Sequence, residues 1–225
     1  MKANACLCQS LLFLAALSAF AVTATEIPAG TQLELRLKTL KDPRGLELLK
    51  RLGEMMQWKP QPMVGPPSNI GRGLSYIHYK HDETYVAMGM DIVVDRASGR
   101  IRVERVYCAH DCGQIINPDG VRAQIEGCIT QTISRALMEE VKFDREKVLS
   151  VDWASYPILR FSDAPRIDID LIDRPKEKPT GAGEAACAPV AAAIANAVFD
   201  AVGVRLRTVP FTPERVKAAL EGKSS

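Results

Sequence analysis

Apolar and polar residues alternate most regularly in the middle of the chain. In residues 84–95 every second position is apolar, which predicts a strand with one buried face. The turn-forming sequence Ala97-Ser98-Gly99 follows and leads into a second predicted strand at residues 101–107, so the two form a β-hairpin. Residues 167–172 alternate in the same way and predict a further strand. The side chains expected on the buried face of the first strand are Val86, Met88, Met90, Ile92 and Val94.

A helical repeat replaces this alternation after Asn117-Pro118. Asparagine is a favoured N-cap and proline suits the first helical position, so we expect a helix from there to about residue 140. Its apolar positions recur three or four residues apart, as on one face of a helix. These positions are Val121, Ile125, Ile129, Ile133, Ala136 and Leu137.

Two further helices are predicted, one toward each end of the chain. Asp42-Pro43 opens a leucine-rich helix that runs to about residue 57. Residues 189–201 are rich in alanine, and such small side chains would let a bulky group pack closely against the start of that helix. Residues 61–73 are rich in proline and glycine and predict a loop. The mixture of helices and strands predicts an α+β fold.

Composition places the chain among ordinary globular proteins. Hydrophobic residues make up 47% and charged residues 25% of the sequence, which is enough for one domain or two small lobes. The 29 basic and 27 acidic residues are interspersed and leave a net charge of +2. This balance gives no sign of a nucleic-acid partner.

The N-terminus has the pattern of a secretory signal peptide over residues 1–24. Lys2 precedes an apolar run at residues 11–22, and Val22-x-Ala24 offers small residues for cleavage. The run is short for a transmembrane span. We therefore expect a periplasmic location. A fortuitous apolar start on a cytoplasmic protein is the alternative.

A candidate proton acceptor follows the glycine pair Gly181 and Gly183. Glycine adopts positive φ readily and lets the backbone lie close to a bulky ligand, so Glu184 would project beside that ligand as a base. A carboxylate that caps the following helix is the alternative interpretation.

A second candidate surface lies on the helix predicted after Asn117. Gln124 and Gln131 are seven residues apart and point the same way, with Gly127 between them. Two amides beside a glycine can approach a polar ring system and form hydrogen bonds with it. Glu126 lies on another side of the helix and is not expected at this surface.

Other polar residues are more simply explained by structure. Cys108-x-His110-x-Cys112 lacks a second ligand pair at the spacing of a zinc site, so we expect packing or loop roles there and no protein-held metal. Asp168 and Asp170 are expected on the solvated edge of a strand. A disulfide among the cysteines remains open if the chain is exported. The cysteines concerned are Cys108, Cys112, Cys128 and Cys187.

Taken in order, these motifs resemble the molybdenum-cofactor subunit of the xanthine dehydrogenase/aldehyde oxidase family. The tail at residues 183–216 is similar to the bacterial isoquinoline 1-oxidoreductase and nicotinate dehydrogenase type. The resemblance covers roughly residues 35–220, so we expect a partial molybdopterin-binding C-terminal domain at residues 31–220. The motifs that carry it are Asp111-x-Gly113, Asn117-Pro118, Gln124-x-Glu126-Gly127, Gln131 and Gly181-x-Gly183-Glu184.

The resemblance implies a fold, a cofactor and a reaction. The fold would be part of the α+β molybdenum-cofactor-binding domain. Family members hold a molybdenum–molybdopterin dinucleotide, a cytosine dinucleotide in the bacterial type, and hydroxylate aldehydes or N-heteroaromatics with water as oxygen source. Glu184 would be the catalytic base, and Gln124 would hydrogen-bond the pterin. The remaining cofactor-binding residues implied are Gly127, Gln131, Gly181, Ala182 and Gly183.

The resemblance also implies partners. Electrons would leave through a separate iron–sulfur subunit. The molybdenum subunit of the family is several times longer than 225 residues, so we expect another chain to supply the missing N-terminal part. A non-catalytic protein that retains the site motifs is the alternative hypothesis.

Overall fold

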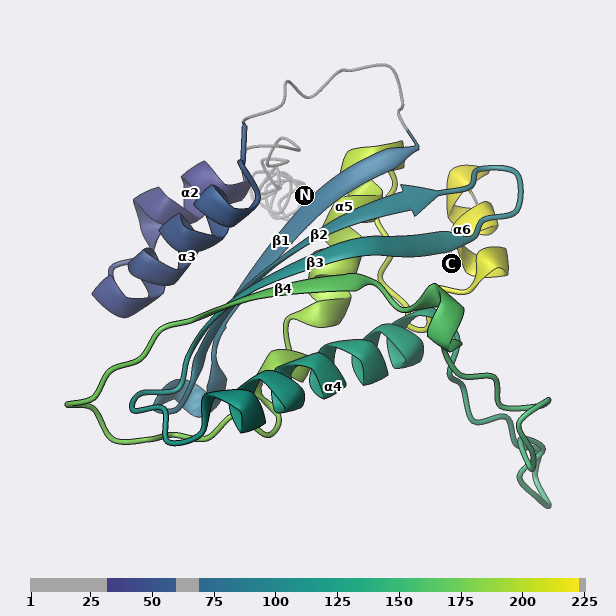
Figure 1. Ribbon diagram of the computed structural model, residues 1–225. Coiled ribbons are helices and arrows are strands. Elements are labelled where there is room, and N and C mark those ends of the chain that lie inside the picture. The colour runs from purple at the N-terminus through teal and green to yellow at the C-terminus, as the bar shows by residue number, and fades with distance from the viewer. Residues whose placement is uncertain (1–31, 60–68, 223–225) are drawn as a thin grey trace, which may run out of the picture.

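The computed structural model describes residues 32–59 and 69–222. The predicted signal peptide and most of the predicted loop at residues 61–73 lie outside these ranges. Within them the α+β prediction is confirmed: one four-stranded sheet carries helices on both faces (Figure 1).

The sheet has the order β1-β2-β3-β4. Its first three strands are antiparallel, and β4 runs parallel to β3. The predicted hairpin of β2 and β3 is confirmed, and at its turn the Asp95 side chain accepts a hydrogen bond from the backbone N–H of Ala97. The strands are β1 (Ile70–His78), β2 (Tyr85–Val94), β3 (Ile101–Asp111) and β4 (Arg166–Leu171).

Two boundaries differ from the sequence predictions. Residues 70–73, predicted as a loop, begin β1. β3 continues to Asp111, beyond the predicted end at residue 107, and so carries Cys108 and His110 into the sheet. Pairing with neighbouring strands overrides the weak local signal in both places.

The three predicted helices, α3, α4 and α5, begin within one residue of their predicted starts, whereas α2 and α6 were not predicted. Asp42 caps α3 by accepting a hydrogen bond from the Arg44 N–H, and Asn117 caps α4 in the same way from the Gly120 N–H. α4 ends at Leu137, three residues before the predicted end. The helices are α2 (Gln32–Thr39), α3 (Pro43–Met55), α4 (Pro118–Leu137), α5 (Val190–Val202) and α6 (Pro213–Leu220).

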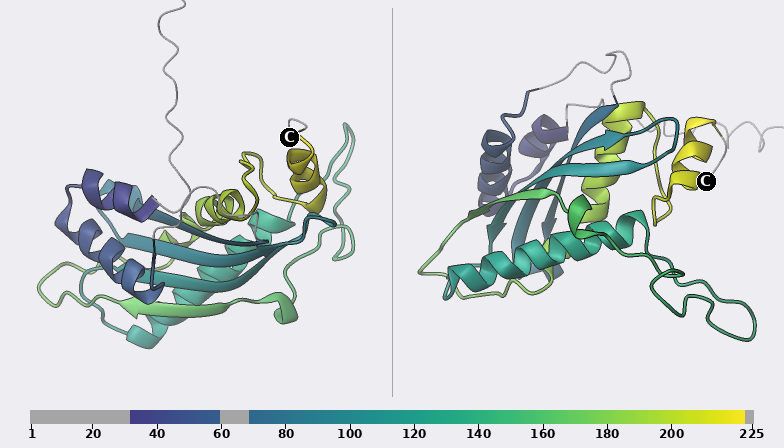
Figure 2. Two further views of the ribbon diagram at one scale, coloured as in Figure 1. Left: turned by 90° about the horizontal axis from the view of Figure 1, so that it is seen from above. Right: turned by 45° about the vertical axis from the view of Figure 1, so that its right-hand side comes forward.

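The sheet separates two apolar cores. The alternating residues of β2 predicted to share a face, from Val86 to Val94, pack with α4, α5 and α6. The other face, including Tyr85 and Ala87, packs with α2 and α3. Figure 1 shows α2 and α3 to one side of the strands and α5 passing behind them, and Figure 2 gives the same layers from two other directions.

Three alanines of α5, Ala193, Ala197 and Ala201, are buried against β1. A Cβ added at Gly73 would lie 2.2 Å from the backbone oxygen of Ala193, and one at Gly71 would lie 2.0 Å from that of Ala197. Small residues on both elements therefore allow β1 and α5 to pack at close range. The sequence interpretation that these alanines receive a bulky group at the helix start is wrong for Ala193 and Ala197, which are buried against β1.

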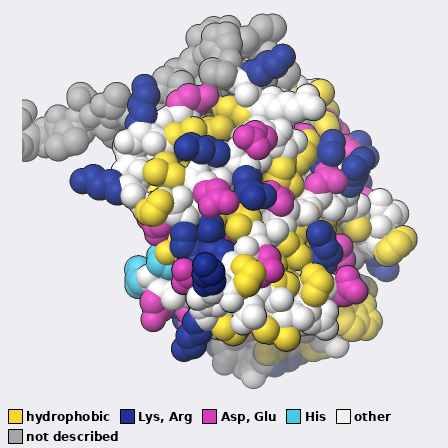
Figure 3. Space-filling view, turned by 60° about the vertical axis from the view of Figure 1, so that its left-hand side comes forward, with side chains coloured by type: hydrophobic (Ala, Val, Ile, Leu, Met, Phe, Trp, Pro, Cys, Tyr) yellow, Lys and Arg dark blue, Asp and Glu magenta, His cyan; other side chains and the backbone are white. Residues whose placement is uncertain are grey.

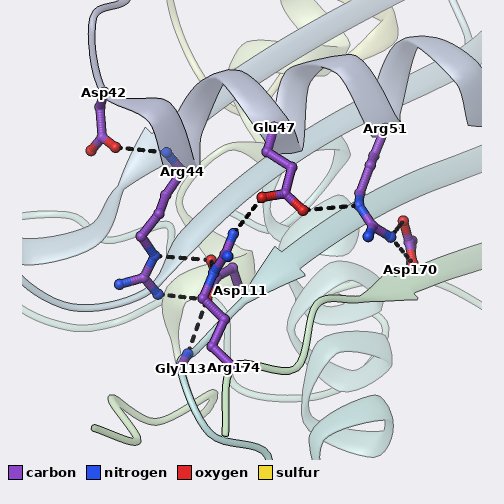
Figure 4. Close-up of polar contacts among 8 residues, drawn as sticks. All are labelled: Asp42, Arg44, Glu47, Arg51, Asp111, Gly113, Asp170 and Arg174. Carbon is purple, nitrogen blue, oxygen red and sulfur yellow. Dashed lines mark hydrogen bonds and ion pairs between the residues drawn. The ribbon is translucent and has the colours of Figure 1, made fainter. Parts of the chain in front are cut away.

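A buried carboxylate ties three segments together at one end of the sheet (Figure 4). The side chain of Asp111 has no exposed surface and forms ion pairs with Arg44 of α3 and Arg174 of the loop after β4, each at 2.5 Å. It also accepts a hydrogen bond from the Gly113 N–H at 3.0 Å. Burial alone would raise the pKa of Asp111, but the two guanidinium groups outweigh it and hold the pKa below its usual value.

The network continues along α3. Glu47 accepts a hydrogen bond from Arg174 at 2.8 Å and pairs with Arg51 at 3.4 Å, and Arg51 reaches Asp170 of β4 at 3.0 Å. Asp168 and Asp170 lie partly exposed on β4, an edge strand of the sheet, as the sequence predicted, and both are ion-paired there, Asp168 with Arg105 at 2.5 Å. On the side of the molecule seen in Figure 3, basic and acidic side chains alternate across the surface.

Candidate functional site

The glycine loop of residues 180–184 is held by Thr84, just before β2, and by Cys112, just after β3. The Thr84 hydroxyl donates to the Gly181 carbonyl at 2.6 Å and lies 2.9 Å from the Thr180 hydroxyl. The Thr180 N–H donates to the carbonyl of Cys112 at 2.9 Å. These contacts fix the inner side of the loop and leave Gly181 and Gly183 exposed on its outer side.

Glu184 lies exposed at the end of this loop. Its carboxylate accepts a hydrogen bond from the Tyr79 hydroxyl at 2.8 Å, and this bond is the main cause of a raised pKa at Tyr79. The residue stands before the short 3-10 helix Ala185–Cys187, yet its side chain makes no capping hydrogen bond there. The capping interpretation is therefore wrong. Glu184 and Tyr79 line a shallow depression of about 220 Å³, with Lys80, Glu83 and the glycine loop around them.

The face of α4 that carries the glutamines is open. Gln124, Gly127 and Gln131 are exposed, whereas Ile125 and Ile129 between them are buried in the core. The structure thus confirms the predicted orientation of the two amides on a single exposed side of the helix.

Two cysteines join this helix to the glycine loop. The Cys128 thiol donates to the Gly183 carbonyl at 3.1 Å, and the Cys187 thiol lies 3.8 Å from the Cys128 carbonyl. Burial, followed by the neighbouring Cys187 thiol, raises the pKa of Cys128 to about 12, so the group stays protonated at neutral pH. The four cysteines considered for a disulfide are all free. The helix surface and the loop are therefore neighbouring parts of one site.

At two positions of this site, packing within the described fold does not explain why the residue is glycine. No heavy atom of the described residues lies within 4 Å of a Cβ placed on Gly127 or Gly183, and neither residue has positive φ. Gly181 is equally open but does have positive φ, at 88°. Glycine within a helix is less stable than alanine by roughly 0.5–1 kcal/mol, so Gly127 weakens α4 with no gain inside the described fold. The openings fit a bulky group that approaches the backbone.

His110, expected from the sequence in a packing role or in a loop near the cofactor, lies within a strand. It is fully buried in β3 opposite Val86, and neither ring nitrogen has a hydrogen-bond partner among the described residues. Burial lowers its pKa to about 4, against a smaller opposing effect of Asp111, so the ring is neutral at physiological pH. Within residues 32–59 and 69–222 no three potential ligands cluster as for a metal ion, and Cys108 and His110 belong to the interior of the sheet.

Comparison with known proteins identifies the family and the fold. Residues 58–165 match the family model described as "Molybdopterin cofactor-binding domain". The chain is 45% identical over 201 residues to a nicotinate dehydrogenase subunit of Pseudomonas putida, covering 84% of this chain and 17% of that protein. It is 31% identical over 183 residues to the beta subunit of isoquinoline 1-oxidoreductase from Brevundimonas diminuta, covering 81% and 23%. The chain thus spans less than a quarter of the length of either relative.

Solved structures share the fold. Quinoline 2-oxidoreductase from Pseudomonas putida 86 matches with a TM-score of 0.58 and 31% identity, over 63% of this chain and 19% of that one. Aldehyde oxidoreductase from Desulfovibrio gigas matches with a TM-score of 0.55 and 29% identity, over 61% and 15%. The chain belongs to the xanthine dehydrogenase/aldehyde oxidase family and corresponds to part of its molybdopterin-binding subunit.

Proposed function

We propose that this chain forms one side of a molybdopterin site in an oxidoreductase that hydroxylates aldehydes or N-heteroaromatic compounds with water as oxygen source. The observation that carries the proposal is the open surface between α4 and the glycine loop. Gly127 and Gly183 border it without any internal reason to be glycine. A pterin bound at this surface would explain both glycines, because a side chain at either position would occupy the space that the pterin needs.

Each side chain at this surface has a role suited to its chemistry. The exposed amides of Gln124 and Gln131 would donate to and accept from the pterin, and the backbone of residues 181–183 would lie against it. When bound, the cofactor supplies the redox chemistry. Glu184 is the proton acceptor, and the Tyr79 hydroxyl donates to its Oε2 atom and thereby holds the carboxylate in place.

The relatives suggest the finer assignments. The names of the two relatives mention nicotinate and isoquinoline, and the solved structure from Desulfovibrio gigas is named for an aldehyde, which supports a small heteroaromatic or carbonyl substrate. Both relatives are named as subunits of their enzymes. We propose an iron–sulfur subunit as the electron acceptor and a further polypeptide that covers the other side of the cofactor. We propose the cytosine dinucleotide form, which nucleotide analysis of released cofactor would test.

A second hypothesis is a non-catalytic chain that retains the site residues. Under this hypothesis the chain holds neither molybdenum nor pterin with any partner, whereas the enzyme hypothesis requires both.

Export to the periplasm is a separate proposal, which rests on the apolar run at residues 11–22. Sequencing the N-terminus of the chain recovered from its host would show cleavage near Ala24 if a signal peptide operates. An intact Met1 in the cytoplasmic fraction would contradict export.

The enzymatic proposal is tested by two substitutions in the assembled complex. We expect Glu184→Gln to abolish turnover and leave molybdenum content unchanged, because only the proton acceptor is lost. We expect Gln124→Ala to lower molybdenum and pterin content, because a hydrogen bond to the cofactor is removed. Glu177→Gln, on an exposed loop, is the matched control and should change neither quantity. Normal turnover of Glu184→Gln would remove Glu184 as the base.

A further inference from the structure

Two thiols meet between α4 and the loop that carries Glu184. Cys128 lies on α4, and Cys187 ends the short 3-10 helix Ala185–Cys187, which packs against α4. The Cys128 thiol donates to the Gly183 carbonyl at 3.1 Å, and the Cys187 thiol lies 3.8 Å from the Cys128 carbonyl. The two thiols are also hydrogen-bond partners of each other. A cysteine pair therefore joins two segments that are 59 residues apart in the chain.

The two thiols differ in their access to solvent. Cys187 is partly exposed, whereas Cys128 is only 6% exposed. Burial raises the pKa of Cys128 to about 12, and a protonated, buried thiol reacts slowly with oxidants. A dissolved oxidant therefore meets Cys187 first, with Cys128 in place as the second thiol. Cys108 and Cys112 are both buried, and desolvation raises the pKa of each.

The same pair is connected to both sides of Glu184 in the chain. The Cys187 N–H donates to the Glu184 carbonyl at 2.9 Å, and the Cys128 thiol supplies a donor to the carbonyl of the preceding residue, Gly183. Thr84 holds the other end of the loop through the Gly181 carbonyl. A change at either sulfur would therefore act on the backbone directly beside Glu184.

We propose that Cys128 and Cys187 are a redox-sensitive pair that hydrogen peroxide converts to a disulfide, and that this conversion releases the loop carrying Glu184. The oxidation requires nothing of the cofactor. Its consequence for Glu184 as a base rests on the proposed function.

The oxidation proceeds in two steps. The Cys187 sulfur attacks one peroxide oxygen, the O–O bond breaks, one water leaves and Cys187 becomes a sulfenic acid. The Cys128 sulfur then attacks the Cys187 sulfur, the S–O bond breaks, and the hydroxyl leaves as a second water with the Cys128 proton. The two thiols lose two electrons and the peroxide gains them, so the products are one disulfide and two waters.

The disulfide removes the hydrogen that Cys128 donates to Gly183. A sulfur bonded to a second sulfur has no S–H group, so the Gly183 carbonyl loses this donor. The new covalent bond does not replace the lost contact, because it holds Cys187, which follows Glu184 in the chain. We expect residues 180–184 to open more often in the oxidised chain and the Glu184 carboxylate to be less well positioned.

The test uses the full chain with Cys6→Ser and Cys8→Ser, because these two cysteines lie outside the described residues. The reduced protein is treated with hydrogen peroxide, the remaining thiols are alkylated, and the peptides are identified by mass spectrometry. We expect one peptide pair in which Cys128 and Cys187 are linked within a single chain, and dithiothreitol should separate it. The other two cysteines of the described chain should remain reduced.

Amide hydrogen exchange of the same samples measures the loop. Residues 180–184 should exchange about fivefold faster in the oxidised chain, the factor expected when one hydrogen bond is lost. Helix α3 is the internal reference and should exchange at the same rate in both forms.

Single substitutions separate the pair from its neighbours. Cys187→Ser should leave Cys128 reduced after peroxide treatment, because the thiol that reacts first is gone. Cys128→Ser keeps a hydroxyl donor toward Gly183 and should leave Cys187 as a sulfenic acid that dimedone labels. Cys112→Ser is the matched control and should still give the disulfide.

Three results would overturn the pairing: a disulfide between any other two cysteines, a cross-link between two chains, or oxidation of Cys187 without a disulfide. Unchanged exchange of residues 180–184 in a chain that carries the disulfide would overturn the release of the loop. Neither readout involves molybdenum. A disulfide with a released loop, in a protein whose assembled complex holds no molybdenum, would support the redox pair while contradicting the proposed function.

Discussion

At the scale of single residues, glycines divide into two kinds in this protein. Gly71 and Gly73 are required by contacts within the fold, whereas Gly127 and Gly183 are bordered by open space among the described residues. Sequence reasoning identified the second kind through their place beside Gln124 and Glu184. It did not identify the first kind, because the partner of β1 is a helix more than a hundred residues away.

The open space around Gly127 predicts that Gly127→Ala raises the stability of the isolated chain but lowers the molybdenum content of the assembled complex. The isolated chain should become more stable by about 0.5–1 kcal/mol, since alanine favours a helix and meets no neighbour. In the assembled complex the same change should lower molybdenum content, because the added methyl group enters the proposed cofactor surface. Urea unfolding and metal analysis give the two readings. Unchanged molybdenum in a normally assembled complex would count against cofactor contact at Gly127.

A buried imidazole predicts a pH dependence of stability. His110 has a pKa of about 4 in the fold, against about 6.5 in the unfolded chain, so below pH 6.5 the unfolded chain binds the extra proton. Stability is therefore full above pH 6.5 and falls as the pH drops toward 4, by on the order of 3 kcal/mol. His110→Leu should lose this part of the decline. If both proteins lose equal stability between pH 6.5 and pH 4.5, His110 is not neutral and buried.

At the scale of elements, local signals predicted helix starts better than strand ends. Asp42-Pro43 and Asn117-Pro118 are caps that act within a few residues, and both helices begin there. The end of β3 and the start of β1 depend on pairing with β2, which the sequence around them does not reveal. The ionic contacts of Asp111 were missed for the same reason, since Arg44 and Arg174 are 67 and 63 residues away.

The close contact of β1 with α5 predicts a large effect of Gly73→Ala. The new Cβ would meet the Ala193 carbonyl oxygen at 2.2 Å, so the helix must shift or the strand must bend. We expect a loss of about 2–3 kcal/mol in the free energy of unfolding, typical of an overpacked core. Gly127→Ala is the control in the same urea titration. A loss below about 0.5 kcal/mol would show that β1 and α5 are not packed as described.

The Asp111 network predicts a strong and pH-dependent effect of Asp111→Asn. The substitution leaves Arg44 and Arg174 without their shared buried anion, and we expect a loss of about 3 kcal/mol near neutral pH. The pKa of Asp111 is lowered in the fold, so its contribution is present above the ordinary aspartate value of about 3.9 and is lost as the pH falls below it. The stabilities of the two proteins should therefore converge in acid.

Asp170→Asn is the control for this prediction. Its ion pair with Arg51 lies at the surface, and such pairs contribute about 1 kcal/mol or less. Equal losses for the two substitutions at neutral pH would contradict a special role of the buried carboxylate.

At the scale of the whole molecule, two apolar cores are buried on the two faces of the sheet, and the candidate site residues are exposed on one side of the fold, which we call the open side. The sheet and its two cores account for most apolar residues, as the alternation in β2 predicted. The exposed apolar side chains at residues 141–161 were not predicted from the sequence, because they follow neither a helical nor a strand repeat. The open side carries the Gln124 surface and the Glu184 loop.

The most direct test of the account is the molybdenum and pterin content of the chain purified from its native host with its bound partners. The account predicts about one molybdenum and one pterin per chain in a complex that contains the completing polypeptide. A stable complex of that composition with neither molybdenum nor pterin would contradict it, and would leave Gln124, Gly127 and Glu184 as retained but unused residues.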